Sequence, residues 1–198
     1  MKNKKHIIHC IAALGCASVI STNAFAFGGY ERITDRGVRV TAQDAIYGDI
    51  GDWTQLAIPI SAAIYSAMIS DWEGLKQLGF TAGSTVVTTE VLKRTVEADR
   101  PYQLDGSEGV SFPSGHTSFA FAGATYWQRR YGWAIGIPMY AAASFVGYSR
   151  VRVKMHNWAD VIGGAVVGIG FGYLFTDRYN VSVQPTDGGA MLRLNTKF

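Results

Sequence analysis

Cysteine is almost absent from this chain of 198 residues, and the two that occur, Cys10 and Cys16, lie near its N-terminus. A disulfide framework, the usual support of a small secreted fold, is therefore excluded for the rest of the chain. The chain also has no G-x-S-x-G sequence, which argues against a serine hydrolase of the α/β type. Apolar runs of about 20 residues, the length that spans a bilayer comfortably, are missing too.

The N-terminus has the three parts of a secretory signal. Three of the first five residues are lysines, residues 7–20 are largely apolar, and Ala24-Phe25-Ala26 is a small-x-small cleavage site. We expect residues 1–26 to be removed as a signal peptide, and the alternative is a first membrane helix that stays attached. Removal takes away both cysteines and lowers the formal net charge from +3 to about zero. The pI of 8.9 therefore gives no argument for nucleic acid binding.

Most of the remaining chain has the composition of packed helices. Residues 27–52 are polar and rich in Gly and Asp, and we expect them to form a solvated lead-in loop. Five stretches of helical length, rich in Ala, Gly, Ser and aromatic residues, follow at 53–70, 77–93, 117–128, 133–148 and 160–175. The predicted fold is all-α, a compact bundle of about five core helices over residues 53–178.

The last residues of the chain differ in pattern from the bundle. Apolar and polar residues alternate at Val181–Val183 and again at Met191–Leu194, and Pro185 to Gly189 have the composition of a turn. We therefore expect a short C-terminal β-hairpin in the tail, residues 179–198.

Three short segments carry most of the residues suited to phosphate chemistry. They read K-x6-R-P at Lys93 to Pro101, P-S-G-H at Pro113 to His116, and S-R-x5-H-x3-D at Ser149 to Asp160. Each segment lies where one of the predicted helices begins or ends. In an up-and-down bundle these positions all fall at the same end, so the segments converge on one pocket. Beyond the signal the chain has two histidines, and both lie in these segments.

In order and internal spacing, the three segments resemble the signature of one superfamily. It joins type 2 phosphatidic acid phosphatases, bacterial non-specific acid phosphatases and vanadium haloperoxidases. The resemblance covers roughly residues 53 to 176, and no signature position is missing. It implies a phosphatase that needs no metal and no cofactor.

The chemistry of a phosphate ester assigns a role to each catalytic candidate. His156 is the predicted nucleophile, through a phosphohistidine intermediate. Asp160 lies one helical turn further on and would orient the ring of His156 by a hydrogen bond. His116 is the predicted general acid for the leaving oxygen, which gives a bell-shaped pH–rate profile.

The predicted phosphate ligands are three cationic side chains and one helix N-terminus. Lys93, Arg100 and Arg150 would neutralise the phosphate oxygens. Ser114 is a good N-cap, and Gly115 allows the backbone to approach an anion at the start of the helix. The neighbouring cations are expected to be solvated; they are Arg94, Arg152 and Lys154.

The resemblance implies an exported envelope phosphatase acting on a lipid phosphate or diphosphate such as phosphatidate, phosphatidylglycerol phosphate or undecaprenyl diphosphate. With residue 27 on the periplasmic side, five crossings would place every motif there and Gln128-Arg129-Arg130 in the cytoplasm. Glu90, the short apolar stretches and a mean hydropathy of +0.09 favour the alternative, a soluble periplasmic acid phosphatase. A phosphotransferase, a vanadium haloperoxidase and a non-catalytic scaffold are the remaining hypotheses.

Overall fold

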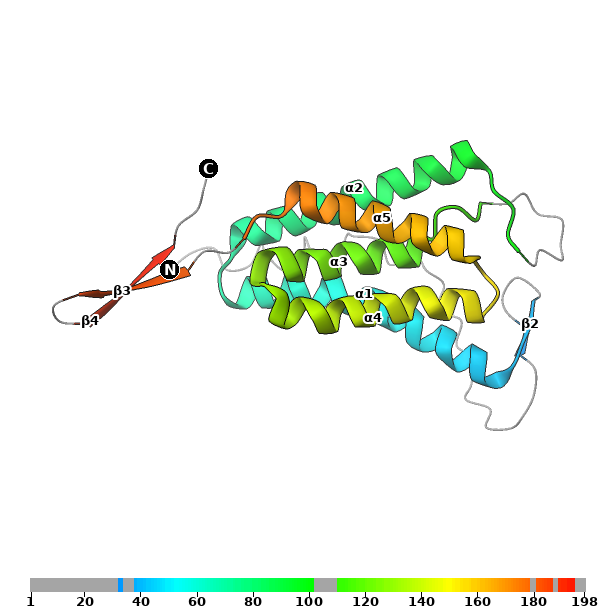
Figure 1. Ribbon diagram of the computed structural model, residues 1–198, viewed down its shortest axis with the longest axis horizontal. Coiled ribbons are helices and arrows are strands. Elements are labelled where there is room, and N and C mark those ends of the chain that lie inside the picture. The colour runs from blue at the N-terminus through cyan, green and yellow to red at the C-terminus, as the bar shows by residue number, and fades with distance from the viewer. Residues whose placement is uncertain (1–31, 34–37, 102–109, 179–180, 187–188, 195–198) are drawn as a thin grey trace, which may run out of the picture.

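The computed structural model describes residues 32–33, 38–101, 110–178, 181–186 and 189–194, so the predicted signal peptide lies outside it. Five helices form the body of the molecule (Figure 1): α1 Ala42–Met68, α2 Trp72–Val96, α3 Gly115–Tyr131, α4 Trp133–Arg152 and α5 Trp158–Phe175. Two short strands, β1 Arg32–Ile33 and β2 Arg39–Val40, precede them as an antiparallel pair. The prediction of an all-α bundle of about five helices is confirmed.

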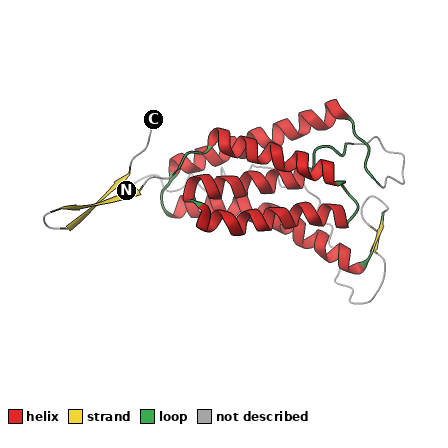
Figure 2. Ribbon diagram, viewed as in Figure 1, coloured by secondary structure: helices red, strands yellow, loops and turns green. Residues whose placement is uncertain are grey.

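The C-terminal hairpin is present as well. Strands β3 Val181–Thr186 and β4 Gly189–Leu194 pair antiparallel, with Val181 opposite Leu194. Figure 2 shows these strands in yellow, extending away from the red helices at the end of the bundle where α5 finishes. The strands β3 and β4 follow α5 and lie beyond one end of the bundle, so they do not cover the opposite end.

The prediction of a lead-in loop up to residue 52 is wrong for its last eleven positions. Helix α1 begins at Ala42, and Thr41 caps it by accepting a hydrogen bond from the backbone N–H of Asp44. The polar composition that suggested a loop reflects contacts with other helices. Asp44, for example, is buried and paired with Arg152 of α4.

Helix α3 is the centre of the bundle and contacts each of the other four helices. Its closest partner is α5, which turns Gly164, Gly168 and Gly172 towards it at four-residue spacing. A Cβ atom at Gly168 would collide with the backbone oxygen of Ser118, so only glycine allows the two helices to lie this close. This contact also sets the start of α5 beside the start of α3.

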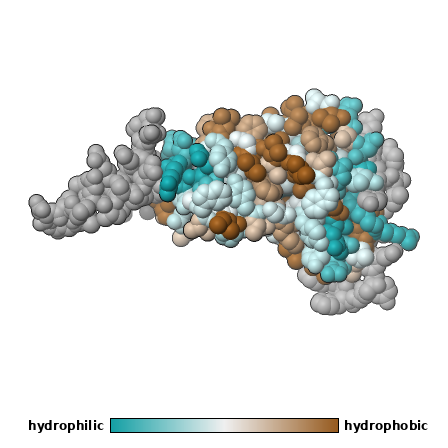
Figure 3. Space-filling view, viewed as in Figure 1, coloured by the Kyte–Doolittle hydropathy of each residue, from teal (hydrophilic) through white to brown (hydrophobic). Residues whose placement is uncertain are grey.

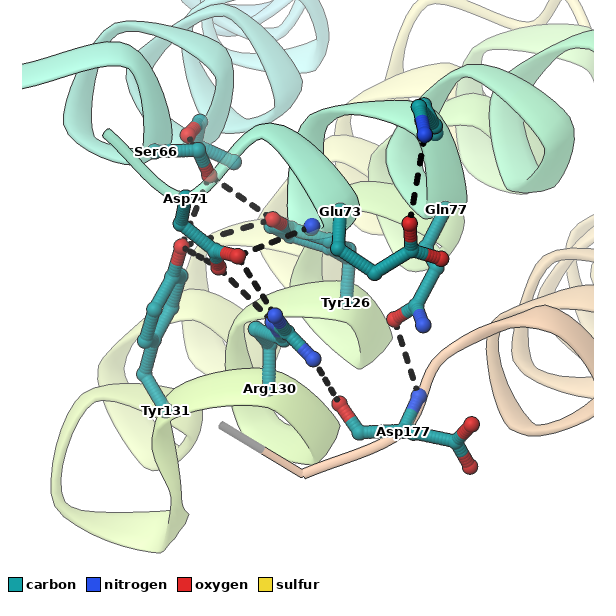
Figure 4. A network of polar contacts seen from close by, with 11 residues as sticks. Ser66, Asp71, Glu73, Gln77, Tyr126, Arg130, Tyr131 and Asp177 are labelled. Carbon is teal, nitrogen blue, oxygen red and sulfur yellow. Dashed lines mark hydrogen bonds and ion pairs between the residues drawn. The ribbon is translucent and has the colours of Figure 1, made fainter. Parts of the chain in front are cut away.

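A buried polar cluster closes the end of the bundle where the hairpin begins (Figure 4). Asp71 caps α2 through the N–H of Gly74, and it accepts hydrogen bonds from Arg130 Nε at 2.7 Å and from the Tyr131 hydroxyl at 2.8 Å. Arg130 also donates to the backbone oxygen of Asp177, beyond the end of α5. The cluster therefore joins the start of α2, the end of α3 and the segment that follows α5 by hydrogen bonds.

One described helix, α5, is long and apolar enough to cross a membrane by length and composition. A core helix of a soluble protein passes the same test, but only 28% of this segment is buried inside the molecule.

Candidate active site

The three predicted segments meet at one end of the bundle, opposite the hairpin (Figure 1). Helices α2 and α4 end there, and α3 and α5 begin there. A backbone hydrogen bond of 2.9 Å from the N–H of Ser114 to the oxygen of Asp160 joins the starts of α3 and α5 directly. The expected convergence is therefore observed.

His156 and Asp160 form a buried pair at the start of α5. Nδ1 of His156 lies 3.4 Å from Oδ2 of Asp160, and both side chains are almost fully buried. Asn157 and Asp160 also form a capping box, in which each side chain accepts the other's backbone N–H at 3.0 Å. The carboxylate is thus fixed by the helix start itself, and it holds Nδ1 of the imidazole so that Nε2 points away from Asp160.

A third buried side chain, Ser111, completes this arrangement. Its hydroxyl donates a 2.6 Å hydrogen bond to Oδ2 of Asp160 and lies 3.3 Å from Nδ1 of His156. The sequence did not identify Ser111, because it lies in a loop outside the spaced motif positions. One chemical argument could have indicated such a residue, because a buried carboxylate needs more hydrogen-bond donors than one imidazole supplies.

Burial lowers the pKa of His156 to about 4, and the charges of Arg100 and Lys93 act in the same direction. The hydrogen bond to Asp160 raises the pKa of His156, but by less than burial and the two cations lower it. The imidazole is therefore neutral at ordinary pH, which is the state that a nucleophile requires.

Two of the predicted phosphate ligands are attached to the loops that carry the site. Lys93 Nζ donates to the backbone oxygen of Val110 at 2.8 Å, and Arg100 Nη1 donates to the backbone oxygen of Met155 at 3.1 Å. These acceptors directly precede Ser111 and His156 in the chain. Both cations are therefore held close to the histidine, in agreement with their effect on its pKa.

Arg150, the third cation, is buried between α4 and α1. Its guanidinium donates to the backbone oxygen of Gly48 at 2.6 Å, to Asp52 Oδ1 at 2.6 Å and to Ser149 Oγ at 3.1 Å. Because three hydrogen bonds hold the guanidinium, the orientation of its planar set of N–H donors is fixed.

The start of α3 offers backbone donors. Ser114 caps the helix, as predicted, and its Oγ accepts from both the backbone and the hydroxyl of Thr117. The N–H groups of Gly115 and His116 make no hydrogen bond within the described part of the chain. Gly115 keeps this surface open and lies near Lys93, whose Cε would be 4.0 Å from a Cβ placed on the glycine. Helix N-termini of this kind bind anions.

His116 contacts a residue that the sequence did not single out. Its Nε2 lies 2.9 Å from Oδ1 of Asp52 on α1, the same oxygen that Arg150 contacts. Sixty-four positions separate the two residues in the sequence, so no local spacing reveals the pair. Both side chains are partly exposed at the end of the bundle.

Of the three neighbouring cations expected to be solvated, Arg152 and Lys154 are only partly exposed and make hydrogen bonds, with Lys154 Nζ donating to the backbone oxygen of Arg39 at 3.4 Å. Arg152 Nε donates to Asp44 Oδ1 at 2.6 Å, and its guanidinium lies over the rings of Tyr47 and Tyr148. Arg94 is exposed, as predicted. Arg152 therefore joins α4 to α1 beside the site.

The site thus combines a neutral buried histidine, three cations, a helix N-terminus and a second histidine at its opening. No group of three or more His, Cys, Asp or Glu side chains suited to a metal ion occurs among the described residues. Such a set can bind a phosphate group and transfer it to an imidazole nitrogen.

The known proteins that this chain resembles include named phosphatases. The model of the PAP2 superfamily matches residues 74–183. The lipid A 4'-phosphatase of Helicobacter pylori is 34% identical over 146 residues, which cover 68% of this chain and 71% of that protein. The lipid A 1-phosphatase of Porphyromonas gingivalis is 45% identical over 74 residues, which cover 35% of this chain and only 16% of that larger protein.

A solved structure shares the fold. The crystal structure of Aquifex aeolicus LpxE superposes with a TM-score of 0.57 and 25% sequence identity, over 67% of this chain and 84% of that one.

Proposed function

Because this chain belongs to the PAP2 superfamily, we propose that it is an envelope phosphatase that removes a phosphate group from a phosphorylated lipid through a phosphohistidine intermediate. One observation carries the proposal. The neutral imidazole of His156 is oriented by Asp160 and Ser111, and the positive charges of Arg100 and Lys93 act on it. These two charges would also attract a bound anion. A hydrolase of phosphoric esters needs both features, a nucleophile and positive charge around it.

In the proposed first half-reaction the phosphate group lies among Lys93, Arg100 and Arg150. Nε2 of His156 forms a bond to phosphorus while the bond from phosphorus to the leaving oxygen breaks. His116 donates its proton to that oxygen. The N–H groups at the start of α3 stabilise the charge on the five-coordinate transition state.

The second half-reaction returns the enzyme to its starting state. Water attacks the phosphorus of the phosphohistidine and gives a proton to His116. The bond from phosphorus to Nε2 then breaks, inorganic phosphate leaves, and both histidines recover their original protonation. The positive charge comes from three side chains, so this chemistry proceeds without metal.

The lipid substrate is inferred from two relatives and from the surface of the bundle. Both relatives are named as lipid A phosphatases, which makes lipid A the first candidate within the wider class of lipid phosphates and diphosphates. Large apolar side chains are exposed along the outer helices, among them Ile60, Phe80, Ile137 and Val166. Figure 3 shows apolar residues gathered over α2 and α5 in the middle of one face, with hydrophilic residues at both ends.

Exposed tryptophans lie at two levels of the bundle. Trp53 and Trp158 are 73% and 55% exposed and adjoin the site, next to Asp52 and close to His156. Trp72 and Trp133 are 54% and 58% exposed and begin α2 and α4 at the other end. The rise from Trp133 to Arg150 along α4 is about 26 Å, close to the hydrocarbon thickness of a bilayer, about 30 Å. Aromatic residues at both levels of an apolar band support a membrane-embedded bundle.

The proposal is tested by phosphate release from purified protein in the presence of EDTA. Lipid A, undecaprenyl diphosphate, phosphatidate and p-nitrophenyl phosphate are offered in parallel, with His156→Ala as the control. We expect release from a lipid substrate that disappears in the variant. Equal release by the wild type and His156→Ala on every substrate would overturn the proposed function.

Membrane association is measured separately, by washing the membrane fraction with alkaline carbonate. We expect the processed chain to stay in the washed membranes. Recovery in the soluble fraction, together with a preference for p-nitrophenyl phosphate, would favour a soluble periplasmic acid phosphatase of broad specificity.

A further inference from the structure

We propose that Asp52 of α1 is a positioning residue for the general acid, and that it holds the ring of His116 so that Nδ1 faces the leaving oxygen. The inference rests on the proposed function, because it concerns the same reaction. It adds a residue outside the three motif segments and outside residues 74–183, the part of the chain that matches the superfamily model.

The contacts around Asp52 define this role. Oδ1 lies 2.9 Å from Nε2 of His116, and it accepts a hydrogen bond from Nη1 of Arg150 at 2.6 Å. Since Nε2 is engaged by the carboxylate, the ring presents Nδ1 on its other side. Nδ1 makes no hydrogen bond within the described part of the chain, so it is available to a substrate oxygen.

Helix α1 is shaped to bring Asp52 to this point. Gly48 lies one turn before Asp52 on the same face of the helix, and Gly51 directly precedes Asp52. A Cβ at Gly51 would collide with Ser149 Oγ and Arg150 Nη2, and one at Gly48 would collide with the side chain of Val153. Two glycines therefore permit the close approach of α1 to α4 that places the carboxylate between the cation and the histidine.

Each of the two catalytic histidines is thus oriented by a different aspartate. Asp160, in the first turn of α5, orients His156, which lies four residues earlier and just before the helix begins. His116 has no carboxylate at helical spacing in α3, whose sequence contains no Asp or Glu, and Asp52 supplies it from another helix. A carboxylate that orients an imidazole is a recurring device for fixing which nitrogen meets the substrate.

A competing role for Asp52 makes different predictions. The carboxylate contacts Arg150, an expected phosphate ligand, and could instead occupy the position of the substrate anion. In that case its removal would tighten the binding of phosphate and leave the chemical step intact. Positioning predicts the opposite, a slower chemical step with little change in binding.

The test exploits leaving groups that differ in their need for a proton. p-Nitrophenolate departs without protonation, whereas the alkoxide of an alkyl phosphate requires a general acid. In Asp52→Asn we expect kcat/KM for a long-chain alkyl phosphate, which reports the first half-reaction, to fall about tenfold to a hundredfold. We expect kcat/KM for p-nitrophenyl phosphate, and inhibition by inorganic phosphate, to change by less than about threefold. Asp49→Asn is the matched control, because Asp49 is exposed on the same helix one turn earlier.

Three kinetic results would overturn the inference. One is an equal loss on both substrates, which would assign the effect to Arg150 or to the fold. Another is a lower KM and tighter inhibition by inorganic phosphate with kcat unchanged. The third is identical behaviour of the Asp52 and Asp49 variants. Wild type and His156→Ala are assayed alongside, so a failure of the proposed function is recognised separately.

A spectroscopic measurement tests the contact without turnover. Full-length protein labelled with ¹⁵N-histidine carries four imidazoles, and His116→Asn identifies the signals of His116. We expect the Nε2 signal of His116 to move in Asp52→Asn and to stay in place in Asp49→Asn. An unchanged Nε2 signal in Asp52→Asn would remove the basis of the inference, whatever the kinetics.

Discussion

The hydroxyl of Ser111 donates a 2.6 Å hydrogen bond to Oδ2 of Asp160, and both residues are fully buried. The same hydroxyl lies 3.3 Å from Nδ1 of His156, so it contacts both members of the histidine–aspartate pair. Together with the N–H of Asn157, which also binds Oδ2, it fixes the carboxylate at two points. The orientation of His156, the proposed nucleophile, therefore depends on a loop residue as well as on α5.

Ser111→Ala is expected to lower kcat about tenfold with little change in KM, because the carboxylate loses a buried donor and no longer fixes the imidazole firmly. Steady-state kinetics on the preferred substrate provides the measurement. Ser66→Ala is the matched control, since Ser66 is an equally buried serine in the polar cluster at the far end of the bundle. A loss of kcat as large in the control would show that the effect is general destabilisation.

If His156 is the nucleophile as proposed, its pKa, lowered to about 4, is expected to set the acidic limit of activity. Protonation removes the lone pair needed for attack, so activity falls as pH drops through the pKa of this group. Because burial has moved that pKa below the ordinary value of about 6.5, activity should persist between pH 5 and 6, where an unperturbed histidine would already be largely protonated. The pH dependence of kcat/KM tests this, and an acidic limb centred near pH 6.5 would contradict it.

Two glycines of α5 offer a matched pair of substitutions. Gly168→Ala places a methyl group against the backbone of α3 and is expected to destabilise the fold by about 1–3 kcal/mol. Gly170→Ala meets nothing within 4 Å and is expected to be neutral or slightly stabilising. Thermal unfolding in detergent compares the two variants. Equal melting temperatures would mean that α3 and α5 are not packed as closely as described.

The cluster around Asp71 is expected to act on stability alone. Asp71→Asn leaves Arg130 buried without its charged partner, at a cost of about 3–5 kcal/mol. Lys76→Ala breaks an exposed pair with Glu73 and is expected to cost less than about 1 kcal/mol. Chemical unfolding measures both, and kcat at a temperature where the variant is folded should match the wild type. A selective loss of kcat in folded Asp71→Asn would instead connect this end to the site.

The sequence was sufficient for the helices and for the convergence of the motifs, because motif spacing and helix ends are local properties. It was insufficient where contacts cross the bundle. Asp52 and Asp44 lie in a segment that is polar and rich in glycine, and it was interpreted as a loop. Their polarity is explained by partners about a hundred residues away, Arg150 and Arg152. Ser111 was missed for a similar reason, since it lies in a loop and its hydrogen-bond acceptor Asp160 lies 49 residues further on, in α5.

Trapping the phosphoenzyme shows whether His156 carries the phosphoryl group during turnover. Wild-type protein is mixed with substrate labelled with ³²P at the scissile phosphate and quenched within milliseconds in alkali, where phosphohistidine survives. We expect label on the chain that is lost in acid, maps to the peptide containing His156, and is absent from His156→Ala. A labelled His156→Ala protein, or phosphate release by that variant at the wild-type rate, would contradict it.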